Sequence, residues 1–169
     1  LKWPVKAVLP VAVPGIKYIL GILLMIGVLF YFGWIWPGIV LCLVGAFVCW
    51  FFRDPNRSIP EEENALVSPA DGRIIVVDRL AGCEYFDRPC IKISIFMNVF
   101  NVHVNRLPFS GTIEQVIYSP GKFINASLDK ASEHNERNAL VVSTRSAGQY
   151  AVVQIAGLVA RRIVNCAQK

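Results

Sequence analysis

The chain has 169 residues, a length typical of one domain with an appendage, and 54% of its residues are apolar. Its mean hydropathy of +0.48 is not that of an ordinary soluble protein. Lys2, Lys6 and Lys17 give residues 1–52 a charge of +3, and 14 basic against 12 acidic residues give the remainder +2. This charge includes no basic cluster with interleaved aromatic residues, so the sequence gives no case for nucleic-acid binding.

The apolar excess is concentrated in one run, residues 18–52, which contains no charged side chain. A spanning helix needs about 20 apolar residues, so this run is too long for one helix and short for two. Gly33 to Gly38 interrupts it: Trp34 and Trp36 are typical of a membrane interface, and Pro37-Gly38 is typical of a turn. We therefore predict a membrane helical hairpin with helices at about 15–32 and 37–52.

Positive charges flank this run on both sides, with Lys17 before it and Arg53 and Arg57 after it. The positive-inside rule then predicts that both termini, and the domain that follows, lie on the cytoplasmic side of a bacterial or archaeal cell membrane. A signal peptide is disfavoured because the run is long and no small-residue cleavage site precedes Arg53. Two alternatives remain open: a buried hairpin of a soluble core, and a hairpin that enters only one leaflet.

Residues 53–169 predict a domain that is mainly antiparallel β, so the fold class is a membrane helical hairpin plus a β-rich α+β domain, with domains at 1–52 and 53–169. A polar, proline-containing linker opens the second domain, and the interval Asn125–Asn138 predicts a helix or a mobile loop. Short strand-like runs separated by glycine and proline favour a sandwich or barrel. These runs are Arg73–Asp78, Cys90–Met97, Val99–Arg106, Thr112–Tyr118, Leu140–Thr144, Tyr150–Ala156 and Val159–Asn165.

The five cysteines show no metal-ligand spacing, and two of them lie in the apolar run. Their odd number fits reduced thiols in a cytoplasmic compartment better than a disulfide framework. The sequence therefore predicts neither a structural disulfide nor a metal site.

One histidine lies on the polar side of an alternating pattern. Val102 and Val104 alternate with Asn101, His103 and Asn105, and Arg106 follows. This period of two predicts a half-buried strand that presents His103 among amide side chains. The alternative is an ordinary surface histidine at a sheet edge.

Asp71 lies in the sequence Ser68-Pro69-Ala70-Asp71-Gly72, between two strand-like runs. Asp-Gly is ordinary turn chemistry, so a structural role is the alternative interpretation. A carboxylate can also fix the tautomer of an imidazole and stabilise its protonated form. Asp71 and His103 are thus a candidate acid–base pair, but no Gly-x-Ser-x-Gly sequence or cysteine motif supplies a nucleophile.

The motifs occur in the order RDPNR, SPADG, IFMNVFNVHVNRLPFSG, SPGKF and HNERN. This order resembles phosphatidylserine decarboxylase proenzymes of the short, archaeal-type branch, over essentially the whole chain. Enzymes of this family cut themselves at a Gly-Ser step, and the serine becomes a pyruvoyl group on a small α chain. The pyruvoyl forms a Schiff base with phosphatidylserine and accepts electrons while carbon dioxide leaves, which gives phosphatidylethanolamine.

The resemblance implies roles for individual residues. Asp71 and His103 would activate the scissile serine, and His103 would also lie near the pyruvoyl group during turnover. Arg106 and Lys122 are candidates for the lipid phosphate or carboxylate, with solvated surface cations as the alternative. The implied partners are the chain's own α chain, phosphatidylserine and membrane lipid, and a homo-oligomer is left open.

The sequence departs from the family pattern in two places. It contains no Gly-Ser step, since Ser110-Gly111 has the reverse order, and it ends at Lys169. The resemblance therefore implies either a β chain that lacks its tail and its α chain or a truncated chain, and in both cases the chain alone should be inactive. Arg106 also occupies the place where longer bacterial members carry a second histidine, so the division of roles between His103 and Arg106 stays open.

Two functions from other classes are alternatives. One is a non-catalytic, membrane-anchored binding module of lipoyl type, for which no modifiable lysine on a hairpin is evident. The other is a metal-dependent lipid hydrolase using His103, His134 and nearby carboxylates. Two histidines 31 residues apart in unlike surroundings make a weak ligand set.

Overall fold

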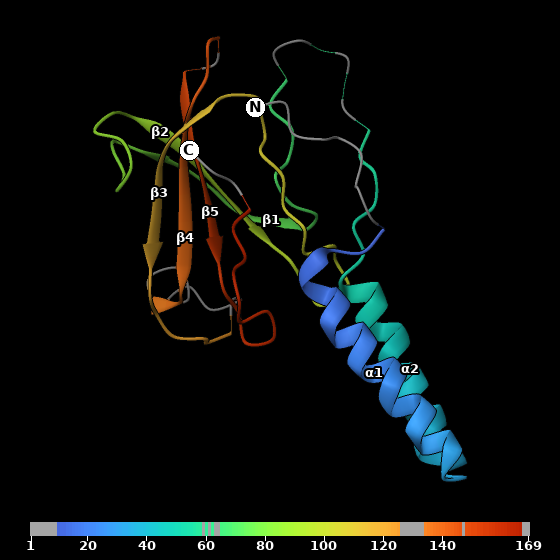
Figure 1. The fold of residues 1–169 in the computed structure, drawn as a ribbon. Helices are drawn as coiled ribbons and strands as arrows, with labels where there is room; N and C mark the ends of the chain where they lie inside the picture. The colour runs from blue at the N-terminus through green and yellow to red at the C-terminus, as the bar shows by residue number, and fades with distance from the viewer. Residues whose placement is uncertain are drawn as a thin grey trace. The chain divides into compact units, whose positions relative to one another are not determined.

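Two N-terminal helices and two antiparallel sheets make up the structure, a computed structural model that describes residues 10–58, 60, 62, 65–125, 134–146 and 148–166 (Figure 1). This is an α+β arrangement, as predicted. The chain divides into two compact units. Pro4–Ile59 and Met97–Asn105 form the helical unit, and Pro60–Phe96 and Arg106–Lys169 make up nearly all of the β unit. The predicted functional domains at 1–52 and 53–169 stay a prediction.

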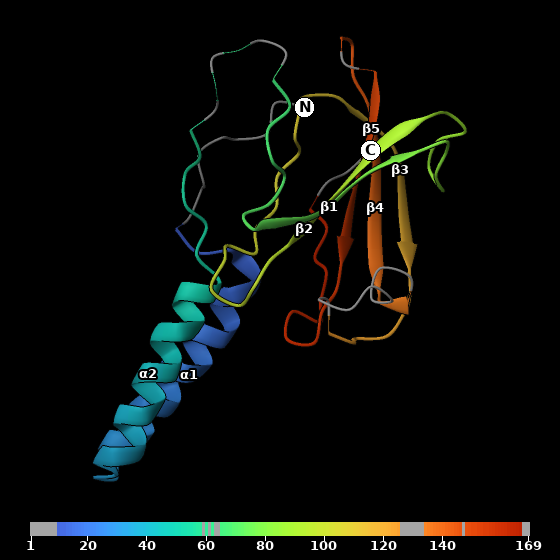
Figure 2. The ribbon, with the colours of Figure 1, turned by 180° about the vertical axis from the view of Figure 1, so that it is seen from behind.

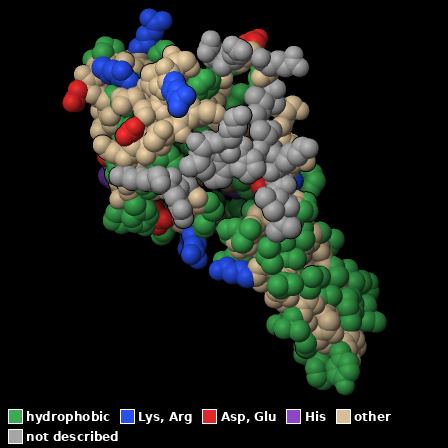
Figure 3. Space-filling view, turned by 45° about the horizontal axis from the view of Figure 1, so that its top comes forward, with side chains coloured by type: hydrophobic (Ala, Val, Ile, Leu, Met, Phe, Trp, Pro, Cys, Tyr) green, Lys and Arg blue, Asp and Glu red, His purple; other side chains and the backbone are tan. Residues whose placement is uncertain are grey.

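The helical unit contains α1, Val13–Tyr31, and α2, Ile35–Phe51, which lie side by side (Figures 1 and 2). These bounds are close to the predicted 15–32 and 37–52. Large hydrophobic side chains are exposed along both helices, and they cover the face of the hairpin visible in Figure 3. Helices that are apolar all round need apolar surroundings. By length and composition α1 can cross a membrane, whereas α2 is shorter.

The connection between the helices is set by Gly33 rather than by the predicted Pro37-Gly38 turn. Gly33 has a φ of 74°, which a glycine adopts without strain. The amide of Gly33 donates to Phe30, and the amide of Trp34 donates to Leu29, the pairing that ends many helices. Pro37 lies in the first turn of α2, where its missing N–H costs no hydrogen bond.

Small residues allow the two helices to approach closely. A methyl group added at Gly38 would lie 2.7 Å from the Phe30 ring, and one at Gly45 would lie 3.1 Å from Ile22. At the open end of the hairpin, the amide of Ala12 donates to the Phe52 carbonyl at 2.7 Å. The amide of Asp54 likewise donates to the Pro10 carbonyl at 2.8 Å. The segments that enter and leave the hairpin are thus joined.

The larger sheet of the β unit contains β3, Thr112–Ser119, β4, Arg137–Ser143, and β5, Gln149–Ile155, in that order across the sheet. All neighbouring strands are antiparallel. The central strand β4 is buried over residues 138–142. Ile113, Leu140 and Val142 form its core cluster, against which Leu107 and Tyr150 pack.

The smaller sheet pairs β1, Arg73–Leu80, with β2, Cys90–Phe96, and has an irregularity between Ile74 and Val76. The described strands therefore form two antiparallel sheets and no closed barrel. The five cysteines, all within the described residues, are free thiols.

Two predicted strands are wrong. Val99–Arg106 is not a strand, because the amide of Phe100 donates to the Asn98 side chain and the amide of Asn98 donates to the Asn101 side chain. Such side-chain bonds replace the ladder bonds of a strand. Val159–Asn165 is also irregular, since the amide of Gly157 bonds locally to Ala160 and that of Arg161 to Val159.

The interval predicted as a helix or mobile loop, Asn125–Asn138, falls partly outside the described residues, at 126–133. Its last two residues, Arg137 and Asn138, belong to β4, which corrects the predicted end of the interval. Residues Lys122 and Asn135 form an isolated parallel bridge.

Candidate functional site

The candidate base His103 lies in the loop Met97–Asn105, which belongs to the helical unit and connects to the end of α2. Two side chains of that end bind the Phe100 carbonyl: Trp50 donates through Nε1 at 3.3 Å, and Arg53 donates through Nη2 at 2.8 Å. The rings of Phe47 and Phe100 also meet edge to face, with centroids 6.2 Å apart. The last turns of α2 therefore hold the middle of this loop.

The imidazole of His103 is constrained on two sides. Its ring stacks on Phe51 with centroids 4.2 Å apart and planes inclined by 26°. Its Nδ1 lies 3.0 Å from the Asn101 carbonyl oxygen. A carbonyl oxygen can only accept, so Nδ1 carries the proton and Nε2 keeps its lone pair. This is the tautomer that a general base requires.

The pKa of His103 is lowered from its usual value of 6.5, chiefly because burial disfavours the charged imidazolium. The positive charge of Arg53 lowers this pKa further, while the hydrogen bond to Asn101 opposes the shift. At neutral pH the imidazole is consequently uncharged and can take up a proton.

Asp71 lies in a turn of the β unit just before β1. Backbone bonds connect this turn to the segment that follows the histidine loop: the amide of Arg106 donates to Pro69 at 2.9 Å, and the amide of Val67 donates to Pro108 at 3.1 Å. The structure therefore brings the Ser68–Gly72 motif together with Arg106, two parts of the predicted site that are far apart in sequence.

Gly72 allows the Asp71 turn to pass across the end of β2. A methyl group at this position would collide with the Phe96 carbonyl oxygen and lie 2.9 Å from the Ile95 side chain. The glycine of the SPADG motif therefore has a steric reason in addition to its turn chemistry.

Lys122 is exposed, and its backbone forms a small bridge with the HNERN motif. Its amide donates to the His134 carbonyl at 2.7 Å, and its carbonyl accepts from the Glu136 amide at 3.0 Å. The exposure of the ammonium group agrees with either a ligand contact or the solvated-cation alternative.

Asn135, which sequence reasoning missed, fixes the segment that carries Lys122. It is 2% exposed, and its side-chain amide donates to the carbonyls of Ile124 and Ala156 at 2.8 Å each. Its Oδ1 accepts from the Ile124 amide at 3.0 Å. The only signal in the sequence was that Asn135 belongs to the HNERN motif. Nothing in the local sequence distinguishes a buried asparagine from an exposed one.

The two members of the predicted acid–base pair are carried by different compact units. Asp71 belongs to the β unit and His103 to the helical unit. Their joint role therefore stays a prediction, whereas the local geometry of each is defined.

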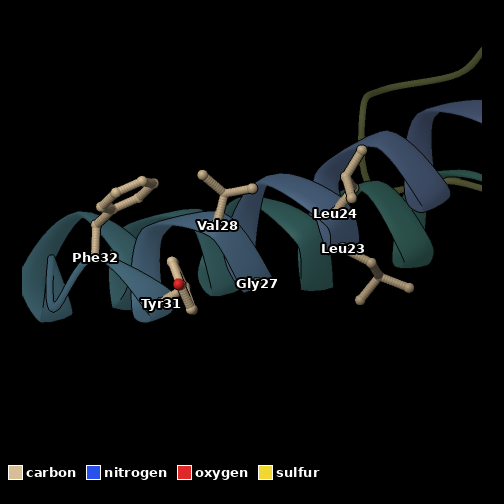
Figure 4. Close-up of a pocket in the computed structure, with 6 residues that line it drawn as sticks. All are labelled: Leu23, Leu24, Gly27, Val28, Tyr31 and Phe32. Carbon is tan, nitrogen blue, oxygen red and sulfur yellow. The ribbon is translucent and has the colours of Figure 1, made fainter.

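The described residues do not favour the metal-hydrolase alternative. No three histidine, cysteine, aspartate or glutamate side chains gather among them, and His134 is exposed. A hollow of about 350 Å³ lies on the outer face of α1 over Gly27, with apolar side chains rising on both sides (Figure 4). A second, of about 290 Å³, is lined by residues 85–88 and Gln149. Neither is lined by a predicted site residue.

Comparison with known proteins gives a consistent result. Residues 44–169 match the family model described as phosphatidylserine decarboxylase. The phosphatidylserine decarboxylase proenzyme of Syntrophus aciditrophicus is 49% identical over 156 residues, which are 91% of this chain and 73% of that protein. The proenzyme of Ralstonia pickettii is 56% identical over 133 residues, which are 79% of this chain and 60% of that protein.

The relatives are thus longer than the chain, which spans about three fifths of the Ralstonia and Cupriavidus proteins that it matches. The predicted archaeal-type branch within the family stays a prediction. Since the family model covers most of the sequence and the relatives are about half identical to it, the chain belongs to the phosphatidylserine decarboxylase family.

Proposed function

We propose that this chain is the base-bearing and membrane-bound part of an enzyme that converts phosphatidylserine to phosphatidylethanolamine. The observation that carries the proposal is the geometry of His103, whose Nδ1 donates to the Asn101 carbonyl and whose Nε2 is left as an acceptor. The family to which the chain belongs, and the proenzyme names of its relatives, support the same activity.

In the proposed maturation step, His103 takes the proton of a serine hydroxyl through Nε2. A serine hydroxyl is a weak nucleophile until a base removes its proton, and the lowered pKa of His103 keeps this base uncharged at neutral pH. Asp71 is proposed to stabilise the imidazolium that results. A protonated imidazole can then return the proton to the leaving amide nitrogen.

The pyruvoyl group made from that serine is proposed to lie on an α chain that self-cleavage separates, in line with the proenzyme names of the relatives. When present, such a group supplies an electron sink for loss of carbon dioxide. His103 fits this chemistry, since an uncharged imidazole with one fixed N–H is the group that serine activation needs. The chain by itself is proposed to be inactive.

Arg106 and Lys122 are proposed to bind the negatively charged head group of the lipid. The backbone of Arg106 is fixed beside the Asp71 turn by its bond to Pro69, and the exposed Lys122 is fixed by its bridge to Asn135. Arginine suits the planar carboxylate, and lysine suits a phosphate as a point charge.

The helical unit is proposed to insert into the cell membrane as a hairpin, with the β unit on the cytoplasmic side. Helices of 19 and 17 residues are about 28 and 26 Å long at 1.5 Å per residue, close to the roughly 30 Å of the hydrocarbon layer. Arg53 lies over the Trp50 ring at 4.3 Å at the end of α2. An indole paired with a cation is typical of the head-group region.

The proposal is tested on the natural protein purified from its source membrane. Intact mass should show two chains, one of which begins with a pyruvoyl group, and the purified enzyme should form phosphatidylethanolamine in phosphatidylserine vesicles. A single uncut chain that leaves the lipid unchanged would contradict the proposal. Chelation of metal ions should leave the activity intact, and loss of activity that added metal restores would favour the metal-hydrolase alternative.

A further inference from the structure

The histidine loop is attached to the hairpin at two points. At Phe100, the backbone carbonyl accepts hydrogen bonds from Trp50 and Arg53. At His103, the imidazole lies on the ring of Phe51, the last residue of α2. The residues that make these contacts lie in the final turn of α2, except Arg53, which is the second residue after its end.

The guanidinium of Arg53 is itself fixed. Its Nη1 donates to the Trp50 carbonyl at 2.8 Å, and its plane lies over the Trp50 ring at 4.3 Å. The same guanidinium donates to the Phe100 carbonyl, so the loop backbone at Phe100 is held at a fixed position relative to the end of α2.

The Phe51 stack and the Asn101 bond together define where Nε2 points. The stack restricts the tilt of the imidazole plane, and the Nδ1 hydrogen bond restricts rotation within that plane. A ring separation of 4.2 Å with nearly parallel planes is a close aromatic contact, worth more than the apolar area that it buries. Without Phe51, only one of the two restraints would remain.

The charged groups near His103 within the helical unit are few. The loop Met97–Asn105 has no other titratable side chain, and Phe51 is neutral. Among the described residues, the charge of Arg53, just after the end of α2, is the one that lowers the pKa of His103. Shielding by Phe51 and repulsion by Arg53 therefore act in the same direction, and both come from the hairpin.

We propose that Phe51 is a positioning residue for His103, so that the membrane hairpin is part of the apparatus that orients the base and is more than an anchor. This inference rests on the proposed role of His103. It adds that a residue of the membrane helix, far from the histidine in sequence, determines the direction of Nε2.

The test compares Phe51→Ala with Phe32→Ala in the full-length proenzyme, reconstituted in lipid nanodiscs. Each variant loses one phenyl ring from the hairpin, but Phe32, at the turn between α1 and α2, packs edge to face on Tyr31, whereas Phe51 stacks on the imidazole. Self-cleavage should slow about tenfold in Phe51→Ala, since a misdirected base loses much of its effect. It should change little in Phe32→Ala, and Phe51→Tyr, which keeps a ring, should cut at nearly the normal rate.

A second readout does not depend on activity. The pKa of His103, followed by nitrogen-resolved NMR of the imidazole with His134→Gln as the assignment aid, should rise in Phe51→Ala because water reaches the uncovered face. It should stay unchanged in Phe32→Ala. Equal pKa values and equal cutting rates in the two variants would overturn the inference. If neither wild type nor variant formed phosphatidylethanolamine, the proposed function would fail, while the pKa comparison would still decide the role of Phe51.

Discussion

The Asp71 turn and the His103 loop are positioned by different means. The turn is held by backbone hydrogen bonds to Arg106 and Pro108 and by a glycine that alone fits beside Phe96. The loop is held by side chains: an indole, a guanidinium and a phenyl ring of α2. The backbone bonds of the turn do not depend on which side chains Arg106 and Pro69 carry, whereas the loop depends on side chains some 50 positions earlier in the chain.

The largest effect is expected for the group that carries the chemistry in the loop. His103→Ala should leave the full-length proenzyme uncut, because no other base takes the serine proton. The measurement is a gel that follows the β and α chains over time. His134→Ala, which removes the other and exposed histidine, should cut normally. Rapid and complete cutting by His103→Ala would refute its role as maturation base, and a lipid assay on the cut variant would then test a role in decarboxylation alone.

The corresponding change in the turn is Asp71→Asn, which keeps the shape and removes the charge. Cutting should slow by about one to three orders of magnitude, because the negative charge proposed to stabilise the imidazolium is lost while the Asn101 carbonyl still holds the Nδ1 proton. The same change at Asp78 on β1 is the matched control and should have little effect. An Asp71→Asn proenzyme that cut at the normal rate would mean that the two segments act independently.

Replacement of Arg106, whose backbone is bonded to the Asp71 turn, should distinguish a role in maturation from a role in turnover. Arg106→Ala should cut normally but decarboxylate about ten- to a hundredfold more slowly at low lipid concentration, since a charge-assisted hydrogen bond is lost. Arg106→Lys should recover part of this activity. The measurements are the cutting gel and formation of phosphatidylethanolamine. If Arg106→Ala instead stayed uncut, this residue would serve maturation.

The backbone restraint on the turn can be broken without touching a functional group. Gly72→Ala should lower the free energy of unfolding by about 2 kcal/mol, because a methyl group collides with the Phe96 carbonyl. Gly82→Ala is the control, since its nearest atom would lie at 3.4 Å. Thermal unfolding in detergent measures both. Equal stability of the two variants would show that the turn can shift away from β2.

The smallest effect concerns the charge that acts on the loop. Nε2 accepts a proton only in the neutral imidazole, so cutting rises with pH and levels off above the pKa of His103, which lies below its usual value. Arg53→Gln removes the positive charge and should raise this pKa, so that the rate of cutting at pH 6, divided by the plateau rate of the same variant, falls about twofold. Arg53→Lys should retain the wild-type pH profile. A profile that did not move in Arg53→Gln would leave burial as the sole cause of the lowered pKa.

Much of the fold could be predicted because its signals are local. The charge-free run defined two helices to within two residues at each end, and short β-rich runs between glycines and prolines predicted all five described strands of the two sheets, with β4 beginning three residues earlier than predicted. The strand predicted at Val99–Arg106 failed because Asn98 and Asn101 bind the backbone of their own loop, which a pattern of apolar residues does not reveal.

In the candidate site, too, local signals could be predicted from the sequence and long-range contacts could not. Asp71, His103 and Arg106 could be named from motifs, but the contacts that place them could not. The stack of His103 on Phe51 joins residues 52 positions apart, and the apolar run around Phe51 indicates only a helix. Asn135 was missed for a related reason, since its three bonds reach Ile124 and Ala156.

The helical unit is built from two separate stretches of sequence, the hairpin and the loop Met97–Asn105. This matters for making a soluble form of the protein. Deleting the chain through Phe52 removes the aromatic rings on which Phe100 and His103 lie. The shortened protein would keep the loop but expose its aromatic side chains to water, so we expect it to aggregate or to carry a misoriented histidine. A workable soluble form would have to graft the last two turns of α2, with polar residues in place of their exposed apolar ones, in front of Arg53.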